Sequence, residues 1–310
     1  MITVNGKLLE VNSVFSGGEL NLKLPNLDLK ERDRVLVDCR GTEPELLLKL
    51  GLVVNAIKHN YAYLNPEINV VLPYLPYARQ DRICNFGEAY GLEFCMDYLA
   101  SLDVKTITSW DVHSNVATEL RKKKKYSHKF AFMNYIYSTG YIHDICKIFS
   151  GKSVVQVLPD EGMYNRSFYI KGNIDPLNTY SLSSNTIQWF KELHDPIIGA
   201  KERGEHSVKI SLNIPENTQN YMNTFNTEVL IVDDICDGGA TFISVVEELK
   251  ALMPWFELNK LNRISLFVTH GIFRNGTDAL YDAGISRIIT TDSIPQNPSN
   301  HKGEFHVIKI

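Results

Sequence analysis

The stretch from Glu228 to Leu252 constrains the fold of this chain more than any other. Within a few residues it passes from an apolar run to acidic and small residues, and then to apolar residues at helical spacing. Val229 to Val232 is a continuous apolar run rich in β-branched residues, which is typical of a strand buried on both faces. The run ends in two carboxylates, Asp233 and Asp234, and small residues follow. Apolar residues then recur at helical spacing. The sequence therefore predicts a strand, an acidic tip, a short loop and a helix.

The loop between the predicted strand and helix favours a phosphate ligand, since it reads Asp237, Gly238, Gly239, Ala240 and Thr241. A glycine-rich turn at the start of a helix directs unpaired backbone N–H groups at an anion. The two preceding carboxylates are poor phosphate ligands, so we assign them to sugar hydroxyls, directly or through a magnesium ion. The inferred ligand is a ribose phosphate. The alternative is a turn that only caps a helix, but two adjacent acids on a buried strand argue against it.

These residues resemble a known loop. Val232-Asp233-Asp234 followed by Asp237 to Thr241 is similar to the ribose-phosphate loop shared by type I phosphoribosyltransferases and ribose-phosphate diphosphokinases, also called phosphoribosyl pyrophosphate synthetases. The loop alone does not separate the two families. The rest of the chain has to do so.

Length, charge and cysteine content restrict the class of protein. The 310 residues are enough for two ordinary α/β domains. The 32 basic and 36 acidic residues give a net charge of −4, so we expect no nucleic-acid partner. The N-terminus lacks signal-peptide features and no apolar window is long enough to span a membrane, so we expect a cytoplasmic protein without a membrane partner. Five cysteines without CxxC spacing argue against a disulfide framework and a zinc site.

Strand-like runs alternate with helical stretches along the chain. This alternation predicts an α/β fold with mainly parallel sheets covered by helices. We predict two units, residues 1–145 and 146–310. A return of the last strand-like segment, Glu304 to Ile310, to the first unit is left open. Strands are predicted near residues 34–38, 68–72, 104–110, 153–158, 197–201, 229–232 and 264–269, and helices over 46–57 and 87–101.

Two segments of the predicted first unit suit a nucleotide. Arg79, Gln80 and Arg82 follow a strand and two prolines and can present several N–H donors to phosphate or to a purine edge. Their hexapeptide YARQDR resembles the ATP-contacting segment of ribose-phosphate diphosphokinases and is not typical of phosphoribosyltransferases. Phe15 and Glu19 lie in a segment similar to the FSDGE segment of that family, whose aromatic and acidic residues hold adenine. From composition alone, a core position for Phe15 is the alternative.

Two further segments resemble the metal and phosphate contacts of the same family. His113 ends the predicted strand over residues 104–110 and corresponds to a histidine that helps to bind magnesium. Asp160 follows the strand over 153–158 and would be a second magnesium contact, with Arg166 as a phosphate contact of ATP. Met163 stands where the family has a second glycine, so this match is partial.

Lys201 and Arg203 are the predicted catalytic cations, and His113 is counted with them as a catalytic residue. The segment of Lys201 and Arg203 resembles the DKRR segment of the same family. Cations beside a transferring phosphoryl group stabilise the charge that develops on its oxygens. Without the flanking matches, a solvent-facing charged triplet would be the preferred interpretation.

The matches run in family order over nearly the whole chain. The resemblance implies two phosphoribosyltransferase-like domains, ATP and Mg²⁺, and transfer of the diphosphoryl group of ATP to the anomeric hydroxyl of ribose 5-phosphate. The products would be AMP and a 1-diphosphate. It also implies a homo-oligomer whose ATP pocket is completed across a subunit boundary.

Departures from the family leave other functions open. Gly238-Gly239-Ala240 stands where the synthetases have Thr-Ala-Gly, so ADP-ribose is an alternative acceptor, giving a diphosphate for NAD salvage. The loop after Arg82 is almost uncharged, whereas the family has a basic mobile loop there. This departure keeps a non-catalytic regulatory partner of a synthetase as a second alternative. A phosphoribosyltransferase is a third, disfavoured by YARQDR and by Lys201 and Arg203.

Overall fold

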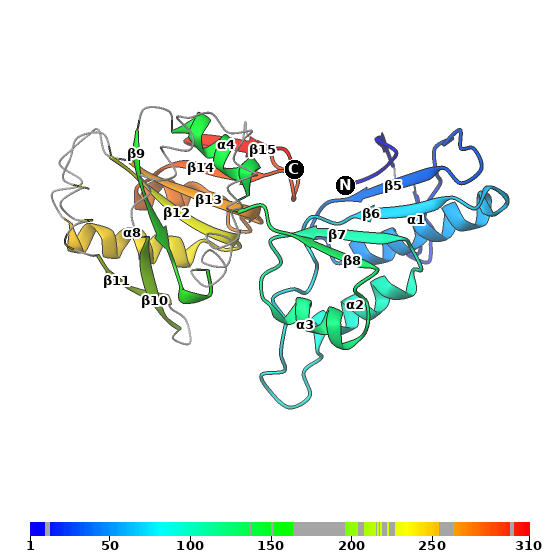
Figure 1. The fold of residues 1–310 in the computed structure, drawn as a ribbon, viewed down its shortest axis with the longest axis horizontal. Helices are drawn as coiled ribbons and strands as arrows, with labels where there is room; N and C mark the ends of the chain where they lie inside the picture. Colours follow the sequence, from blue (N-terminus) through cyan, green and yellow to red (C-terminus); the bar gives the residue numbers. More distant parts are fainter. Residues whose placement is uncertain are drawn as a thin grey trace. The chain divides into compact units, whose positions relative to one another are not determined.

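Strands and helices alternate over much of the described chain in the computed structural model, most clearly from β5 to β9 and from β12 to β14 (Figure 1). The structure describes residues 1–9, 13–136, 138–149, 152–163, 196–203, 208–214, 216, 218, 222, 227–253, 263–297 and 301–310. The chain divides into one unit of Met1–Met133 with Ser293–Pro295, and a second of Asn134–Asp292 with Gln296–Ile310. Among the helices of the described residues, none is long and apolar enough to cross a membrane.

The first unit contains a mainly parallel sheet with the strand order β2-β1-β5-β6-β7-β8 within the described residues. Strands β5 to β8 are parallel, whereas β1 pairs antiparallel with both β2 and β5. A separate hairpin is formed by β3 (Ser13–Val14) and β4 (Leu20–Asn21). The sheet strands are β1 (Ile2–Val4), β2 (Lys7–Leu8), β5 (Arg34–Cys39), β6 (Glu67–Val71), β7 (Thr106–Trp110) and β8 (Phe130–Met133). The helices are α1 (Leu46–Asn60), the short 3-10 helix η1 (Ala62–Leu64), α2 (Gly91–Ser101) and α3 (Val116–Lys123).

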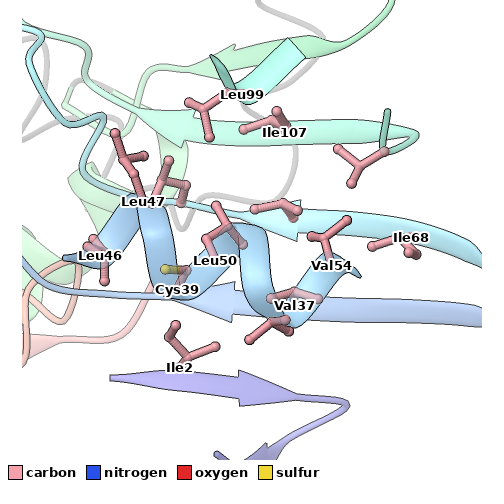
Figure 2. Close-up of a cluster of buried hydrophobic side chains, with 14 of the residues drawn as sticks. Ile2, Val37, Cys39, Leu46, Leu47, Leu50, Val54, Ile68, Leu99 and Ile107 are labelled. Atoms are coloured by element: carbon pink, nitrogen blue, oxygen red, sulfur yellow. The ribbon is translucent and has the colours of Figure 1, made fainter. Parts of the chain in front are cut away.

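The core of the first unit lies on one face of its sheet. In β5, Val35, Val37 and Cys39 are buried while Leu36 between them is exposed. This alternation is the period-two pattern of a strand with one covered face. Figure 2 shows the apolar side chains of α1 gathered with the buried residues of the neighbouring strands, as their spacing of three and four residues predicts. The hydroxyl of Tyr98 on α2 donates to the backbone carbonyl of Leu47 on α1 at 3.1 Å, which holds these two helices together.

The second unit contains a longer sheet with the order β11-β10-β9-β12-β13-β14-β15. Its neighbouring strands are parallel except for β11, which runs antiparallel to β10. The strands are β9 (Ser153–Leu158), β10 (Ile197–Arg203), β11 (Val208–Asn213), β12 (Thr227–Cys236), β13 (Arg263–Gly271), β14 (Ile285–Thr291) and β15 (Glu304–Ile308). The described helices are α4 (Thr139–Ile148), α8 (Ala240–Leu252) and α10 (Asp278–Ala283).

Helices cover both faces of this second sheet. Leu266 and Val268 of β13 share a buried cluster with Phe242 of α8. Phe267, between them, turns the other way and meets the ring of Tyr141 on α4 edge-on, with centroids 4.8 Å apart. The continuous apolar runs of β12 and β13 follow from this double burial, because no side chain of either strand centre faces water.

Two details of the domain organisation complete the description of the units. The last strand does not return to the first unit, since β15 pairs in parallel with β14. The division between the units falls after Met133, before the predicted boundary at residue 145. Helix α4 packs on the second sheet through the ring of Tyr141, which contacts Phe267, and Tyr135 just before the helix contacts the same ring.

A buried ionic network joins the strands at the amino end of this sheet. The fully buried Glu228 carboxylate accepts from Lys152 Nζ at 2.5 Å, from Ser265 Oγ at 2.6 Å and from Arg287 Nη1 at 3.2 Å. Arg287 Nε also donates to Glu304 Oε1 at 2.7 Å. Burial raises the pKa of the Glu304 carboxyl, but hydrogen bonds from Arg287 and His306 outweigh it and hold that pKa at about 2. Glu304 is therefore ionised at neutral pH and ties β15 to β14.

We expect Arg287→Met to destabilise the second unit by about 2–4 kcal/mol, because the buried Glu228 carboxylate loses one of its compensating cations. Arg263→Met is the matched control. Arg263 also contacts Glu304, at 3.6 Å, but its side chain is half exposed, and such pairs contribute less than about 1 kcal/mol. Urea unfolding of both variants measures the difference. Equal losses of unfolding free energy would contradict the structural role of the network.

Candidate functional site

The residues predicted to bind a ribose phosphate gather at the carboxyl edge of the second sheet. Strands β10, β9, β12 and β13 are neighbours and run parallel, so their carboxyl ends meet at one edge. Asp160 follows β9, and the loop from Asp237 to Thr241 follows β12. Binding sites of open α/β sheets form at this edge. Asp233 and Asp234 lie within β12, which continues to Cys236 instead of ending at Val232.

The two acids of β12 are held in an unusual electrostatic environment. Asp233 and Asp234 are both buried, and Asp233 Oδ1 accepts from the backbone N–H of Asp234 at 2.8 Å. Burial, followed by the negative charges of Asp234 and Asp160, raises the pKa of the Asp233 carboxyl well above its usual range. Such a group of carboxyls favours a ligand that brings hydroxyl donors or a cation.

The predicted small loop and helix start are present. Gly239 is the N-cap of α8, with φ of 87°, and its carbonyl accepts from the N–H groups of Phe242 and Ile243. A Cβ at Gly239 would lie 3.1 Å from Leu280 Cδ2. The position therefore requires glycine both for its left-handed backbone and for space. The first turn of α8 directs its N–H groups toward this loop, as an anion site needs.

Arg274 and Asn275 border this loop, and the sequence did not indicate them. A Cβ built on Gly238 would lie 3.2 Å from Asn275 Nδ2 and 3.6 Å from Arg274 Nη2. Both residues are more than thirty positions away in sequence. The signal that could have identified them is their position directly after β13, the strand beside β12.

The predicted catalytic residues lie on β10, the strand next to β9. A Cβ on Gly199 would lie only 2.6 Å from the carbonyl oxygen of Pro159, so glycine permits β10 to approach the end of β9 closely. Lys201 follows two residues later, and its side chain is half-buried. Arg203 ends β10, and its side chain lies outside the described part of the structure.

The predicted ATP-binding cations and His113 lie at the carboxyl edge of the first sheet. Arg79, Gln80 and Arg82 are exposed on the loop after β6, and His113 is half-buried after the adjacent strand β7. The carbonyl of Gln80 accepts from the N–H of Leu92 at 3.1 Å, which fixes the loop to the start of α2.

The segment predicted to hold adenine, which contains Phe15 and Glu19, lies on the β3–β4 hairpin of the first unit. Phe15 N–H donates to the Glu19 carbonyl at 2.8 Å across the β3–β4 turn, and the Phe15 ring is 56% exposed. The core position considered for Phe15 is therefore wrong. A Cβ on Gly17 would lie 2.9 Å from Glu19 Oε2, so the glycine leaves room for that carboxylate. Arg166 lies outside the described residues.

The donors predicted for magnesium are distributed over both units. Asp160 belongs to the second unit and His113 to the first. Among the residues that the structure describes, no three His, Cys, Asp or Glu side chains gather as a closed metal cage. Magnesium commonly uses one or two carboxylates together with water and substrate phosphates. The oxygen donors of Asp160, Asp233 and Asp234 fit that chemistry.

Comparisons of the whole chain with known proteins show which proteins it is similar to. No family model matches the chain. Ribose-phosphate pyrophosphokinase of Mycoplasma genitalium is 24% identical over 309 residues, which cover 96% of this chain and 78% of that protein. The ribose-phosphate pyrophosphokinase of Sulfurisphaera tokodaii is 23% identical over 295 residues, covering 94% and 87%. The crystal structure of phosphoribosylpyrophosphate synthetase from Mycobacterium smegmatis superposes with a TM-score of 0.66 at 17% identity, covering 96% of this chain and 85% of that one.

The two mainly parallel sheets with their flanking helices match the fold of that synthetase, and the similar proteins are named as pyrophosphokinases, which are transferases. Over nearly its whole length the chain is similar, at low identity, to members of the ribose-phosphate pyrophosphokinase family. The resemblance of the separate motifs to this family is thereby confirmed.

We expect Gly239→Ala to lower the unfolding free energy more than Gly276→Ala. Both glycines have positive φ, and a left-handed L-residue costs about 1–2 kcal/mol. Only Gly239 adds a crowded contact, with Leu280, whereas nothing lies within 4 Å of a Cβ on Gly276. Thermal and urea unfolding of the two variants measure the difference. An equal effect of both substitutions would mean that Leu280 does not constrain the loop.

Proposed function

We propose that the protein transfers the diphosphoryl group of ATP, with magnesium, to the anomeric hydroxyl of ribose 5-phosphate. The products are AMP and 5-phosphoribosyl 1-diphosphate. The observation that carries this proposal is the carboxyl edge of the second sheet, where a glycine-capped helix start adjoins two buried aspartates. The names of the relatives support the same reaction.

The residues at this edge have distinct roles in the proposed reaction. The 5-phosphate binds the loop from Asp237 to Thr241 at the start of α8. Asp233 and Asp234 accept hydrogen bonds from the ribose hydroxyls. The burial that raises the pKa of Asp233 makes such hydroxyl donors favourable partners. This binding mode holds the ribose in one orientation, with its anomeric hydroxyl available for attack.

The chemical step is an in-line displacement at the β-phosphorus of ATP. The anomeric oxygen forms the new P–O bond and gives up its proton. The bond between the β-phosphorus and the α,β-bridging oxygen breaks, and AMP leaves with that oxygen. Lys201 and Arg203 stabilise the charge that develops on the transferring group. The close approach of β10 to β9 at Gly199 supports this role for Lys201.

The nucleotide is proposed to bind the first-unit residues that precede and follow its parallel strands. Phe15 and Glu19 hold adenine, and the exposed donors Arg79, Gln80 and Arg82 contact the phosphates. Arg166 adds a further phosphate contact according to the family resemblance.

Asp160 of the second unit and His113 of the first are each proposed as magnesium ligands from the family resemblance, together with the substrate phosphates. When bound, magnesium supplies positive charge that polarises the phosphoryl group. The aspartates at this edge support a cation there, because their mutual repulsion contributes to the raised pKa of Asp233.

Ribose 5-phosphate is favoured over ADP-ribose as the acceptor. The small residues Gly238 and Gly239 could in principle leave room for a longer ligand. In this structure, however, the side chains of Asn275 and Leu280 each approach to within 3.2 Å of the positions where these glycines would carry a Cβ. The glycines accommodate neighbouring side chains, so they do not by themselves favour a longer acceptor.

The protein is also proposed to act as a homo-oligomer. Several exposed apolar side chains lie close in sequence to the predicted ATP-binding loop. Exposed apolar side chains of this kind are typical of a surface that contacts another subunit. In this chain they are Tyr77, Ile83, Phe86 and Phe94.

The purified protein is expected to release AMP from ATP and magnesium when ribose 5-phosphate is supplied, and to lose this activity in EDTA. Parallel reactions contain ADP-ribose in place of ribose 5-phosphate, or no acceptor. Coupled detection of AMP measures the rates. AMP formation chiefly with ADP-ribose would contradict the proposed acceptor, and no AMP with either compound would favour the regulatory alternative.

Lys201→Ala should lower kcat by about 10²–10³-fold with little change in the KM for ATP, because Lys201 is proposed to act mainly in the transition state. Lys209→Ala is the control, since Lys209 is an exposed lysine of the paired strand β11. Steady-state kinetics compare the two. A normal kcat for Lys201→Ala would exclude it as a catalytic residue.

A further inference from the structure

The loop after β13 is fastened to the phosphate-binding loop after β12. The N–H groups of Ile272 and Phe273 both donate to the carbonyl of Cys236, at 2.9 and 3.1 Å. The N–H of Arg274 then donates to the carbonyl of Asp237 at 3.0 Å. Backbone hydrogen bonds therefore hold Arg274 directly beside the loop that is proposed to receive the acceptor.

A second set of contacts fixes the other side of this loop. The ring of Phe273 is buried and meets the ring of Phe305 on β15, with centroids 5.8 Å apart. Gln296 Nε2 donates to the carbonyl of Gly271 at 2.5 Å. With its neighbours anchored on both sides, Arg274 has a defined backbone position, and only its side chain can move appreciably.

The side chain of Arg274 extends over the phosphate-binding loop while most of it faces solvent. It is 70% exposed, and Nη2 lies 3.6 Å from the point where a Cβ on Gly238 would be. It makes an ionic contact with Asp237, with Nε 3.6 Å from Oδ1. That separation is an ion pair and is too long for a hydrogen bond.

We propose that Arg274 binds the 5-phosphate of the acceptor. It supplies the side-chain donor that Gly238 cannot, and it makes the loop selective for an acceptor that ends in a phosphate monoester. This inference rests on the proposed function and names a residue of the acceptor site that the sequence motifs do not contain.

The chemistry of the two possible partners of the Arg274 guanidinium, the Asp237 carboxylate and a phosphate monoester, favours the phosphate. A solvent-exposed ion pair without a hydrogen bond is weak. A phosphate monoester carries close to two negative charges at neutral pH, and guanidinium binds it through two parallel hydrogen bonds. A phosphate esterified onward carries only about one charge and would be held less well.

The test compares Arg274→Gln, Arg274→Lys and the control Arg263→Gln. Arg263 begins β13 and Arg274 follows its end, so the control removes an exposed arginine at the opposite edge of the same sheet. We expect Arg274→Gln to raise the KM for ribose 5-phosphate by about tenfold or more, with the KM for ATP changed less than about twofold. Arg274→Lys should be intermediate, because it keeps the charge and loses the bidentate geometry. Arg263→Gln should match the parent protein.

Calorimetric titration with ribose 5-phosphate separates this inference from the proposed reaction. If the parent protein turns over ribose 5-phosphate but Arg274→Gln has an unchanged KM, only the role of Arg274 is contradicted. If the parent protein binds ribose 5-phosphate without turnover, the proposed reaction fails, and weaker binding to Arg274→Gln still supports the inference, whereas equal binding overturns it. If the parent protein neither binds nor turns over ribose 5-phosphate, both are contradicted.

Discussion

The parallel register of β9, β12 and β13 is the constraint on which the site of the second unit depends. Ile231 of β12 lies opposite Val157 of β9, and Asp233 lies opposite Val268 of β13. These pairings bring the acid after β9, the glycine loop after β12 and the arginine after β13 to one edge. The burial of both sheet faces makes the register specific, because a shift by one residue would exchange the side chains that face α4 and α8.

The same burial creates the electrostatic condition that a ligand would relieve. Asp233 and Asp234 lie in the strand itself, so they are removed from solvent while Asp160 adds a third negative charge nearby. At the amino end of the sheet, the buried Glu228 is instead compensated by Lys152, Arg287 and Ser265 within the chain. The amino end thus serves folding, whereas the carboxyl end, where burial and neighbouring carboxylates raise the pKa of Asp233, suits a substrate and a metal ion.

The sequence predicts local features of this molecule better than those that depend on pairing between distant segments. The Val229–Val232 run, the two glycines and the helical spacing after them identify the β12–α8 unit, because each signal is local. The partner of β15 could not be predicted, since an alternating segment specifies a covered face but no neighbour. The position of Arg274 at the site could not be predicted for a similar reason, because its proximity to Gly238 depends on the β12–β13 register. Phe15 is exposed because a two-stranded hairpin has no core to bury it.

A crystal structure of the protein with ribose 5-phosphate would test the central claim, that the carboxyl edge of the second sheet is the acceptor site. The account predicts density for the phosphate at the start of α8, within hydrogen-bond distance of the backbone of residues 238–241, with the ribose hydroxyls facing Asp233 and Asp234. Phosphate density at another position, with this loop unchanged and no sugar beside the two aspartates, would contradict it.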